Sequence, residues 1–197
     1  MSNEDMQPEF SLPEEIRNLK RKYRGRGVLG RTFIRACLEH CVRYQRITCY
    51  FSSKGLLEWT ETLPRLIRGE LELIQVVFYQ LNDPNDLEAI KQSHDPEAAR
   101  RLREEKIQEV LDFAIFVEDS DKATTQRQKA LAWLIANEKL ELRYVTVTTE
   151  GDSRDLMHEK LGVFHFKEGL QVAFEGSANE SYRAGYKNWE RTKVYKS

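Results

Sequence analysis

A histidine and a lysine two positions apart, His158 and Lys160, have the residue types and spacing that most directly indicate chemistry. On a β-strand, side chains at positions i and i+2 project from the same face, so both groups would enter one site. An imidazole can attack phosphorus, and a fixed ammonium can hold the charge that develops on the phosphate oxygens. The pair therefore predicts phosphoryl transfer that needs no metal ion.

A turn of small residues follows this pair after a short apolar run, with the sequence Gly176-Ser177-Ala178-Asn179. Successive backbone N–H groups in such turns often bind anions. We therefore expect Gly176 and Ser177 to contact a phosphate group.

These motifs resemble the phospholipase D superfamily, and more narrowly its nuclease-type members. Met157–Phe166 resembles their catalytic strand, and Val172–Ser181 resembles the strand and turn that follow it. Asn188–Glu190 is similar to their N-x-E element, and Tyr44–Ser53 to an early strand that ends in Y-F-S. The resemblance extends from about residue 28 onwards. Such nucleases include N-terminal modules of DEAD/DEAH-type helicases and restriction enzymes.

The resemblance implies a role for each candidate residue. His158 would be the nucleophile and form a covalent phosphohistidine, while a second histidine protonates the leaving oxygen and then activates water. Lys160 and Asn179 would hold the non-bridging oxygens, and Glu190 would hydrogen-bond the imidazole and fix its tautomer. No cofactor and no metal enter this mechanism, and DNA or RNA is the expected substrate.

The family mechanism uses two H-x-K copies, and we count one in this chain. The second copy is therefore expected from another subunit, in a homodimer with a composite active site across the two-fold axis. Because the last residues have strand character, we also expect a fragment of a longer protein with a C-terminal helicase region or partner.

One position departs from the family pattern, because His165 stands where the superfamily has an aspartate five residues after the lysine. Position 165 is an odd number of residues from positions 158 and 160, so on a regular strand its side chain points to the opposite face. This indicates a structural role for the histidine. Two other functions therefore stay open. One is a catalytically silent module that binds nucleic acid or dimerises a helicase or defence protein. The other, ranked third, is lipid cleavage, for which no amphipathic membrane-binding stretch stands out.

Bulk composition sets further bounds. The chain has 197 residues, 40% hydrophobic and 32% charged, which is enough for one globular domain. Its net charge of −1 gives no overall attraction to nucleic acid, so binding must depend on local patches. Three cysteines, no signal peptide and no long apolar run predict a cytoplasmic protein without a membrane span. A zinc site at Cys37, His40 and Cys41 is a weaker alternative, because a fourth ligand is not evident.

Two basic clusters are candidates for phosphate contact. The second is favoured, since it flanks the predicted site, whereas the first is as easily explained by ordinary surface charge. The first cluster comprises Lys20, Arg21, Lys22, Arg24, Arg26, Arg31 and Arg35, and the second Arg183, Lys187, Arg191, Lys193 and Lys196.

The hydrophobic pattern predicts an α/β domain over residues 13–197, after a flexible lead at residues 1–12. Helices are expected over 13–24, 32–44, 56–67, 86–92, 96–117 and 124–139. Strands are expected over 47–52, 71–79, 140–148, 157–166, 170–174 and 192–195, with 167–169 as a hairpin turn. This order predicts a mixed β-sheet flanked by helices on both faces, similar to phospholipase D.

Overall fold

The computed structural model describes residues 13–26, 29–59, 62–81, 84–104, 121–145, 159–179 and 189–197. The strands are β1 (Lys22–Arg26), β2 (Arg43–Phe51), β3 (Leu73–Leu81), β4 (Leu140–Tyr144), β5 (Leu161–His165), β6 (Gln171–Gly176) and β7 (Trp189–Lys196). The helices are α1 (Glu14–Arg17), α2 (Arg35–His40), α3 (Leu63–Arg68), α4 (Pro84–His94), α5 (Pro96–Glu104) and α7 (Asp121–Ala136).

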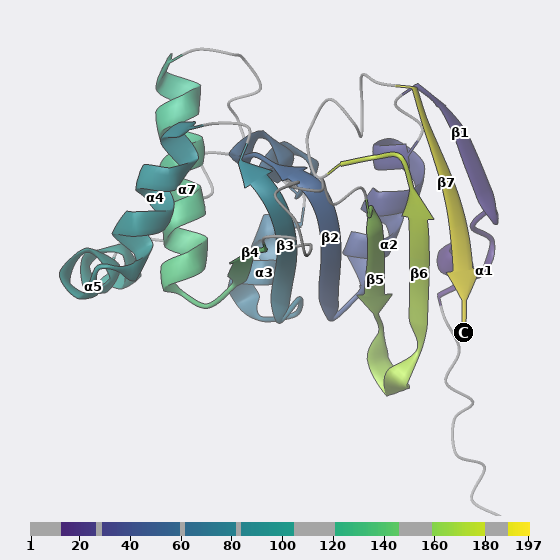
Figure 1. Ribbon diagram of the computed structural model, residues 1–197. Helices are drawn as coiled ribbons and strands as arrows, with labels where there is room; N and C mark the ends of the chain where they lie inside the picture. Colours follow the sequence, from purple (N-terminus) through teal and green to yellow (C-terminus); the bar gives the residue numbers. More distant parts are fainter. Residues whose placement is uncertain are drawn as a thin grey trace, which may run out of the picture.

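The strands form one seven-stranded mixed sheet in the order β1-β7-β6-β5-β2-β3-β4 (Figure 1). β2, β3 and β4 run parallel, as expected for strands joined by helical crossovers. β5, β6 and β7 form an antiparallel meander, and β1 pairs with β7 at the edge. The predicted mixed α/β sheet with flanking helices is confirmed.

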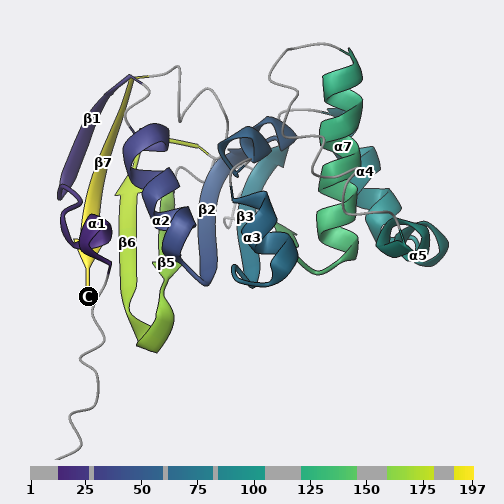
Figure 2. The same ribbon diagram turned by 180° about the vertical axis from the view of Figure 1, so that it is seen from behind.

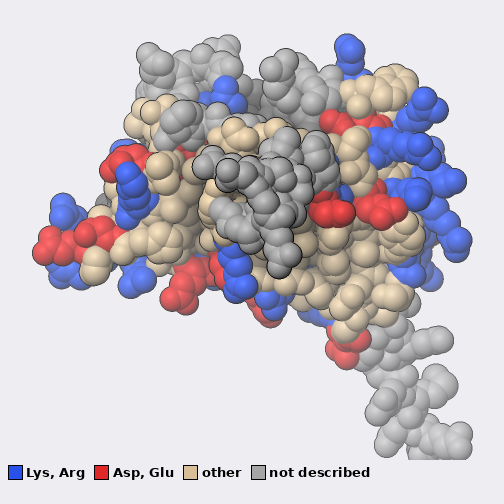
Figure 3. All heavy atoms as spheres, in the orientation of Figure 1, with Lys and Arg blue, Asp and Glu red and all other residues tan. Residues whose placement is uncertain are grey.

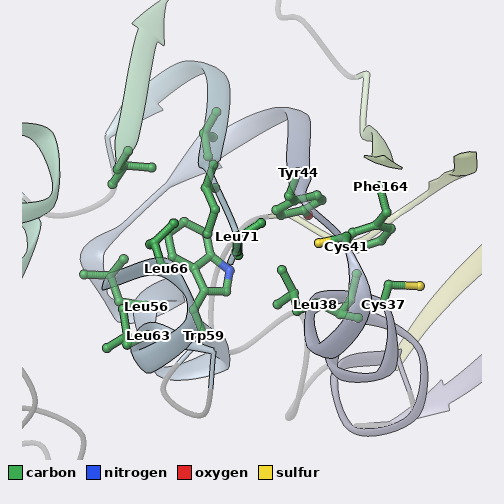
Figure 4. Close-up of a cluster of buried hydrophobic side chains, with 14 of the residues drawn as sticks. Cys37, Leu38, Cys41, Tyr44, Leu56, Trp59, Leu63, Leu66, Leu71 and Phe164 are labelled. Carbon is green, nitrogen blue, oxygen red and sulfur yellow. The ribbon is translucent and has the colours of Figure 1, made fainter. Parts of the chain in front are cut away.

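Helices α2 and α3 lie across one face of the sheet, as Figure 2 shows. Between these helices and the sheet is a buried cluster around Trp59, Leu38 and Tyr44 (Figure 4). On the same face, the ring of Phe164 in β5 stacks on Tyr44 in β2 at 4.5 Å and on Phe174 in β6 at 5.5 Å. These rings join the parallel half of the sheet to the antiparallel half.

A second group of helices packs beside β3 and β4, where α4, α5 and α7 lie together (Figure 1). No helix in the described part of the chain is both long and apolar enough to cross a membrane.

The N-terminal elements differ from the prediction. Instead of one helix over 13–24, the chain forms the single turn α1 and then strand β1. Instead of one helix over 32–44, a π-helical turn (Leu29–Ile34) leads into α2, and Tyr44 already belongs to β2. Cys37 in α2 and Tyr44 in β2 nevertheless both contribute side chains to the core.

The remaining differences concern element boundaries. A 3-10 helix (Ser53–Trp59) and α3 replace the single helix expected over 56–67. Gly69, with a φ of 77°, ends α3. The turn Lys167–Gly169 joins β5 and β6 in the expected hairpin. The helix expected over 96–117 is described as far as Glu104. The strands expected over 140–148 and 157–166 each extend partly outside the described residues.

Candidate active site

The predicted site residues in the described part of the chain gather at one end of the sheet. β2 and β6 finish at this end, whereas the antiparallel neighbours β5 and β7 begin there. In Figure 1 this is the upper end of the strands. It is also the end at which the parallel strands β2 and β3 have their carboxyl ends. Ligands of open α/β sheets bind at the carboxyl ends of the parallel strands.

Lys160 immediately precedes β5 at this end. Its carbonyl oxygen accepts a hydrogen bond from the N–H of Gly176 at 3.0 Å, so its backbone is tied to the last residue of β6. Its Nζ lies 3.1 Å from the Sγ of the buried Cys49 in β2. The ammonium group is thus held over the end of β2. His158, the predicted nucleophile, lies outside the described residues.

Asn179 is held by β2, although it belongs to the turn after β6. Its Oδ1 accepts hydrogen bonds from the N–H of Tyr50 at 3.3 Å and from the hydroxyl of Thr48 at 3.2 Å. A backbone N–H only donates, so the amide atom facing Tyr50 must be the oxygen. The Asn179 NH₂ group, which only donates, is therefore directed elsewhere, as an anion-binding group requires.

Glu190 and Ser177 bind each other. The Ser177 hydroxyl donates to the carboxylate of Glu190, which is buried with 7% exposure, and accepts from the N–H of Arg191 at 3.0 Å. The Ser177 N–H donates to the Arg191 carbonyl at 3.0 Å. The predicted contact of Glu190 with His158 involves a residue outside the described part of the chain and stays a prediction.

The backbone amides of the small-residue turn take part in strand pairing. The N–H groups of Gly176 and Ser177 are both used in pairing with the neighbouring strands, and the expected contact of these residues with phosphate stays a prediction. Gly176 has a different role, because a Cβ there would lie 2.2 Å from the carbonyl oxygen of Arg191 and 2.8 Å from Oγ1 of Thr192. This glycine lets β7 approach closely enough to bring Glu190 beside Ser177.

Arg46 in β2, which none of the sequence motifs singled out, positions the turn. This side chain is only 3% exposed, and its Nη2 donates to the carbonyl of Ala178, next to Asn179. Its guanidinium lies 4.6 Å from the ring centroid of Phe174. Gly162 leaves room for this arrangement, because a Cβ there would lie 2.5 Å from the Phe174 ring. The available signal was an arginine at an inward-facing strand position between Tyr44 and Thr48.

A surface depression of about 370 Å³ opens at this end of the sheet. Two carboxylates and three cationic side chains contribute to its wall. Its lining includes Glu159, Lys160, Glu175, Ser177, Arg191 and Lys193.

His165 lies at the opposite end of β5 from Lys160. Its Nε2 is 2.7 Å from Oε1 of Gln45, and burial together with the nearby Arg43 lowers the pKa of the imidazole. The count of one H-x-K in the sequence is wrong, because Lys167 follows His165 at the same spacing. However, this second pair lies at the hairpin end of β5, about 17 Å along the strand from Lys160, so it cannot complete the same site.

The three cysteines are free and buried. Burial raises the pKa of Cys37, and it raises the pKa of Cys41 to about 12, so both thiols stay protonated. His40 lies instead 2.9 Å from Glu15 on the surface. Because the His40 imidazole contacts Glu15 on the surface while Cys37 and Cys41 are buried, this arrangement does not support the zinc alternative, which needs thiolates and an imidazole that converge.

No family model and no curated protein matches the chain. Solved structures that resemble it include a mutant of yeast tyrosyl-DNA phosphodiesterase, with 12% identity, a TM-score of 0.40, and coverage of 79% of this chain and 25% of that one. NucT from Helicobacter pylori has 12% identity, a TM-score of 0.46, and coverage of 88% and 82%. The chain thus spans a quarter of the phosphodiesterase, and likeness at these scores carries no argument about function.

Proposed function

We propose that this chain is a metal-independent phosphodiesterase that cleaves DNA or RNA through a covalent intermediate on His158. The observation that carries the proposal is the orientation of Asn179. Its amide oxygen is bound by Tyr50 and Thr48, so its NH₂ group is left to donate at the sheet end that holds Lys160. A fixed donor and a fixed cation at the same end of the sheet are suited to stabilise the charge on a phosphorane.

The proposed reaction has two displacements at phosphorus. In the first, a ring nitrogen of His158 forms a bond to phosphorus while the bond to the leaving oxygen breaks, and a second histidine gives that oxygen its proton. In the second, water attacks phosphorus, its proton passes to the second histidine, and the bond to His158 breaks. Lys160 and Asn179 stabilise the non-bridging oxygens in both steps.

The second histidine is proposed to come from another copy of the chain. Among the other histidines, His165 is bound to Gln45 at the far end of β5, and His40 contacts Glu15. His94 lies in α4, away from the antiparallel half of the sheet (Figure 1). A homodimer would bring two copies of His158 to one phosphate. A helicase region or partner on the C-terminal side is a further part of the proposal.

A catalytically silent nucleic-acid-binding module is the second candidate. It is favoured by the contact between Ser177 and Glu190, because this contact uses one oxygen of the carboxylate that the catalytic mechanism assigns to an imidazole.

The deciding experiment is cleavage of labelled single- and double-stranded DNA and RNA in excess EDTA. We expect cleavage by the wild type and none by His158→Ala. His94→Ala is the matched control, because it removes an exposed histidine from α4 and should leave activity unchanged. Activity that EDTA abolishes would refute the metal-independent mechanism. Inert proteins that still retard nucleic acid on a gel would favour the silent module.

A further inference from the structure

The pairing of β1 with β7 joins the two basic clusters into one surface. Alternate residues of each strand point away from the core, while Tyr23, Thr192 and Val194 between them are buried. Figure 3 shows Lys and Arg side chains gathered over these two strands. We call this surface the β1–β7 basic face. It consists of Lys22, Arg24, Arg26, Arg191 and Lys193.

The strand register places like charges directly opposite one another. Lys22 is opposite Lys193, and Arg24 is opposite Arg191. Like charges in directly opposed cross-strand positions destabilise a sheet unless a counter-charge neutralises them. Glu175 supplies one for Lys193 at 3.2 Å, but Arg24 and Arg191 have no acidic partner among the described residues. Such a surface is suited to a ligand that brings its own negative charges.

An exposed tryptophan stands at one end of the same face. Trp189 is 63% exposed, and the guanidinium of Arg24 lies 5.9 Å from its ring centroid. Exposed aromatic rings next to cationic side chains are the platforms on which single-stranded nucleic acids stack their bases. A base paired within a duplex does not present its face to such a ring.

The basic face is continuous with the candidate active site. Arg191 and Lys193 line the depression that also contains Lys160 and Ser177. Trp189 directly precedes Glu190, whose carboxylate points to the other side of β7 and binds Ser177. A chain that follows the face therefore reaches the candidate site without leaving the strand pair.

We propose that the β1–β7 basic face binds single-stranded nucleic acid, with Trp189 stacking on a base and the opposed arginines Arg24 and Arg191 contacting its phosphates. The proposal rests on the proposed function for what happens to the bound strand, but the binding itself is separate from cleavage. Contacts to phosphates and base faces do not distinguish DNA from RNA, so both should bind.

Intrinsic tryptophan fluorescence tests the stacking directly. Trp59 and Trp133 are 0% and 5% exposed, so quenching by an added oligonucleotide reports on Trp189. We expect oligo(dT) and oligo(U) to quench the fluorescence of His158→Ala in EDTA, where no cleavage occurs. Trp189→Ala should abolish the quenching and weaken binding roughly 5- to 150-fold, the loss expected for one stacked base.

The salt dependence of binding tests the phosphate contacts. Each phosphate contact to a single strand contributes about 0.7 to the slope of log K against log salt, so Arg24→Ala with Arg191→Ala should lower it by about 1.4. The matched control is Arg100→Ala with Arg101→Ala, which removes two exposed arginines from α5 and should leave the slope unchanged. Thermal unfolding of each variant confirms that it is folded.

The outcomes separate the two proposals. An unchanged slope in the Arg24 and Arg191 double variant, or tighter binding of duplex without quenching, overturns the basic face even if the wild type cleaves nucleic acid. Quenching and the reduced slope in a protein that never cleaves support the basic face and refute the nuclease.

Discussion

Replacement of Asn179 by aspartate separates its structural contact from its proposed chemical role. Asparagine and aspartate have nearly the same shape, and both offer an oxygen to the N–H of Tyr50 and the hydroxyl of Thr48. Aspartate, however, has no NH₂ group and adds a negative charge where the phosphate oxygens would lie. Alanine at the same position removes both the contact and the donor.

The expected magnitudes follow from these contacts. Each hydrogen bond contributes about 0.5–1.5 kcal/mol, so Asn179→Ala should lose roughly 1–3 kcal/mol of unfolding free energy. Asn179→Asp keeps both acceptor interactions and should stay within about 1 kcal/mol of the wild type. Loss of one transition-state donor costs about 100- to 1000-fold in rate, and the added charge increases the loss, so both variants should be nearly inactive.

Urea unfolding and cleavage of labelled oligonucleotides in EDTA measure the two effects on the same samples. If Asn179→Asp is as unstable as Asn179→Ala, the amide oxygen does not face Tyr50 and its orientation has been misread. If Asn179→Asp is stable and cleaves within a few-fold of the wild type, Asn179 donates nothing to the reaction and the proposed role is refuted.

Three further predictions concern the surroundings of the site. Gly176→Ala should lower the free energy of unfolding in urea by about 1–3 kcal/mol, because its methyl group would lie 2.8 Å from Oγ1 of Thr192. An unchanged unfolding midpoint would mean that β7 can shift freely. Cys41, whose pKa is raised to about 12 by burial, should resist iodoacetamide at pH 8 until urea unfolds the chain, and rapid labelling of the native protein in mass spectrometry would contradict this burial. Burial and Arg43 lower the pKa of His165 in the folded protein below its unfolded pKa of about 6.5. The contribution of this histidine to stability should therefore be complete above the unfolded pKa and should decrease as the pH falls towards the folded pKa. His165→Gln should flatten that decrease in pH-dependent unfolding, and a histidine NMR titration at or above 6.5 would refute it.

Most buried elements could be predicted from sequence, whereas β1 could not. The sequences of β2, β3 and the β5–β6 hairpin contain apolar residues at the positions that are buried, so these strands can be recognised from sequence. β1 has one buried side chain, Tyr23, between basic residues and a glycine, so its pattern does not differ from that of a polar loop. It is a strand because β7 supplies its hydrogen-bond partners.

For the candidate site, the sequence indicated residue types but not their partners. The motif spacing singled out Lys160 and Asn179, which the fold places at the same end of the sheet. It could not show that Tyr50 orients Asn179 or that Arg46 holds the turn, because these contacts join segments from distant parts of the chain. Nor could it show that strand pairing uses the backbone amides of Gly176 and Ser177, whose phosphate contacts stay a prediction.

The pairing of β1 with β7 also has a consequence for the order of synthesis. Their residues come from opposite ends of the described chain, so β1 is made early but finds its hydrogen-bond partners only when β7 has left the ribosome. Contacts between distant segments form slowly, because a long loop must close before any of them contributes. A nascent chain that lacks β7 has neither the Glu190–Ser177 contact nor the paired edge of β6. Pairing of β1 and the contact between Ser177 and Glu190 therefore both wait for the same strand.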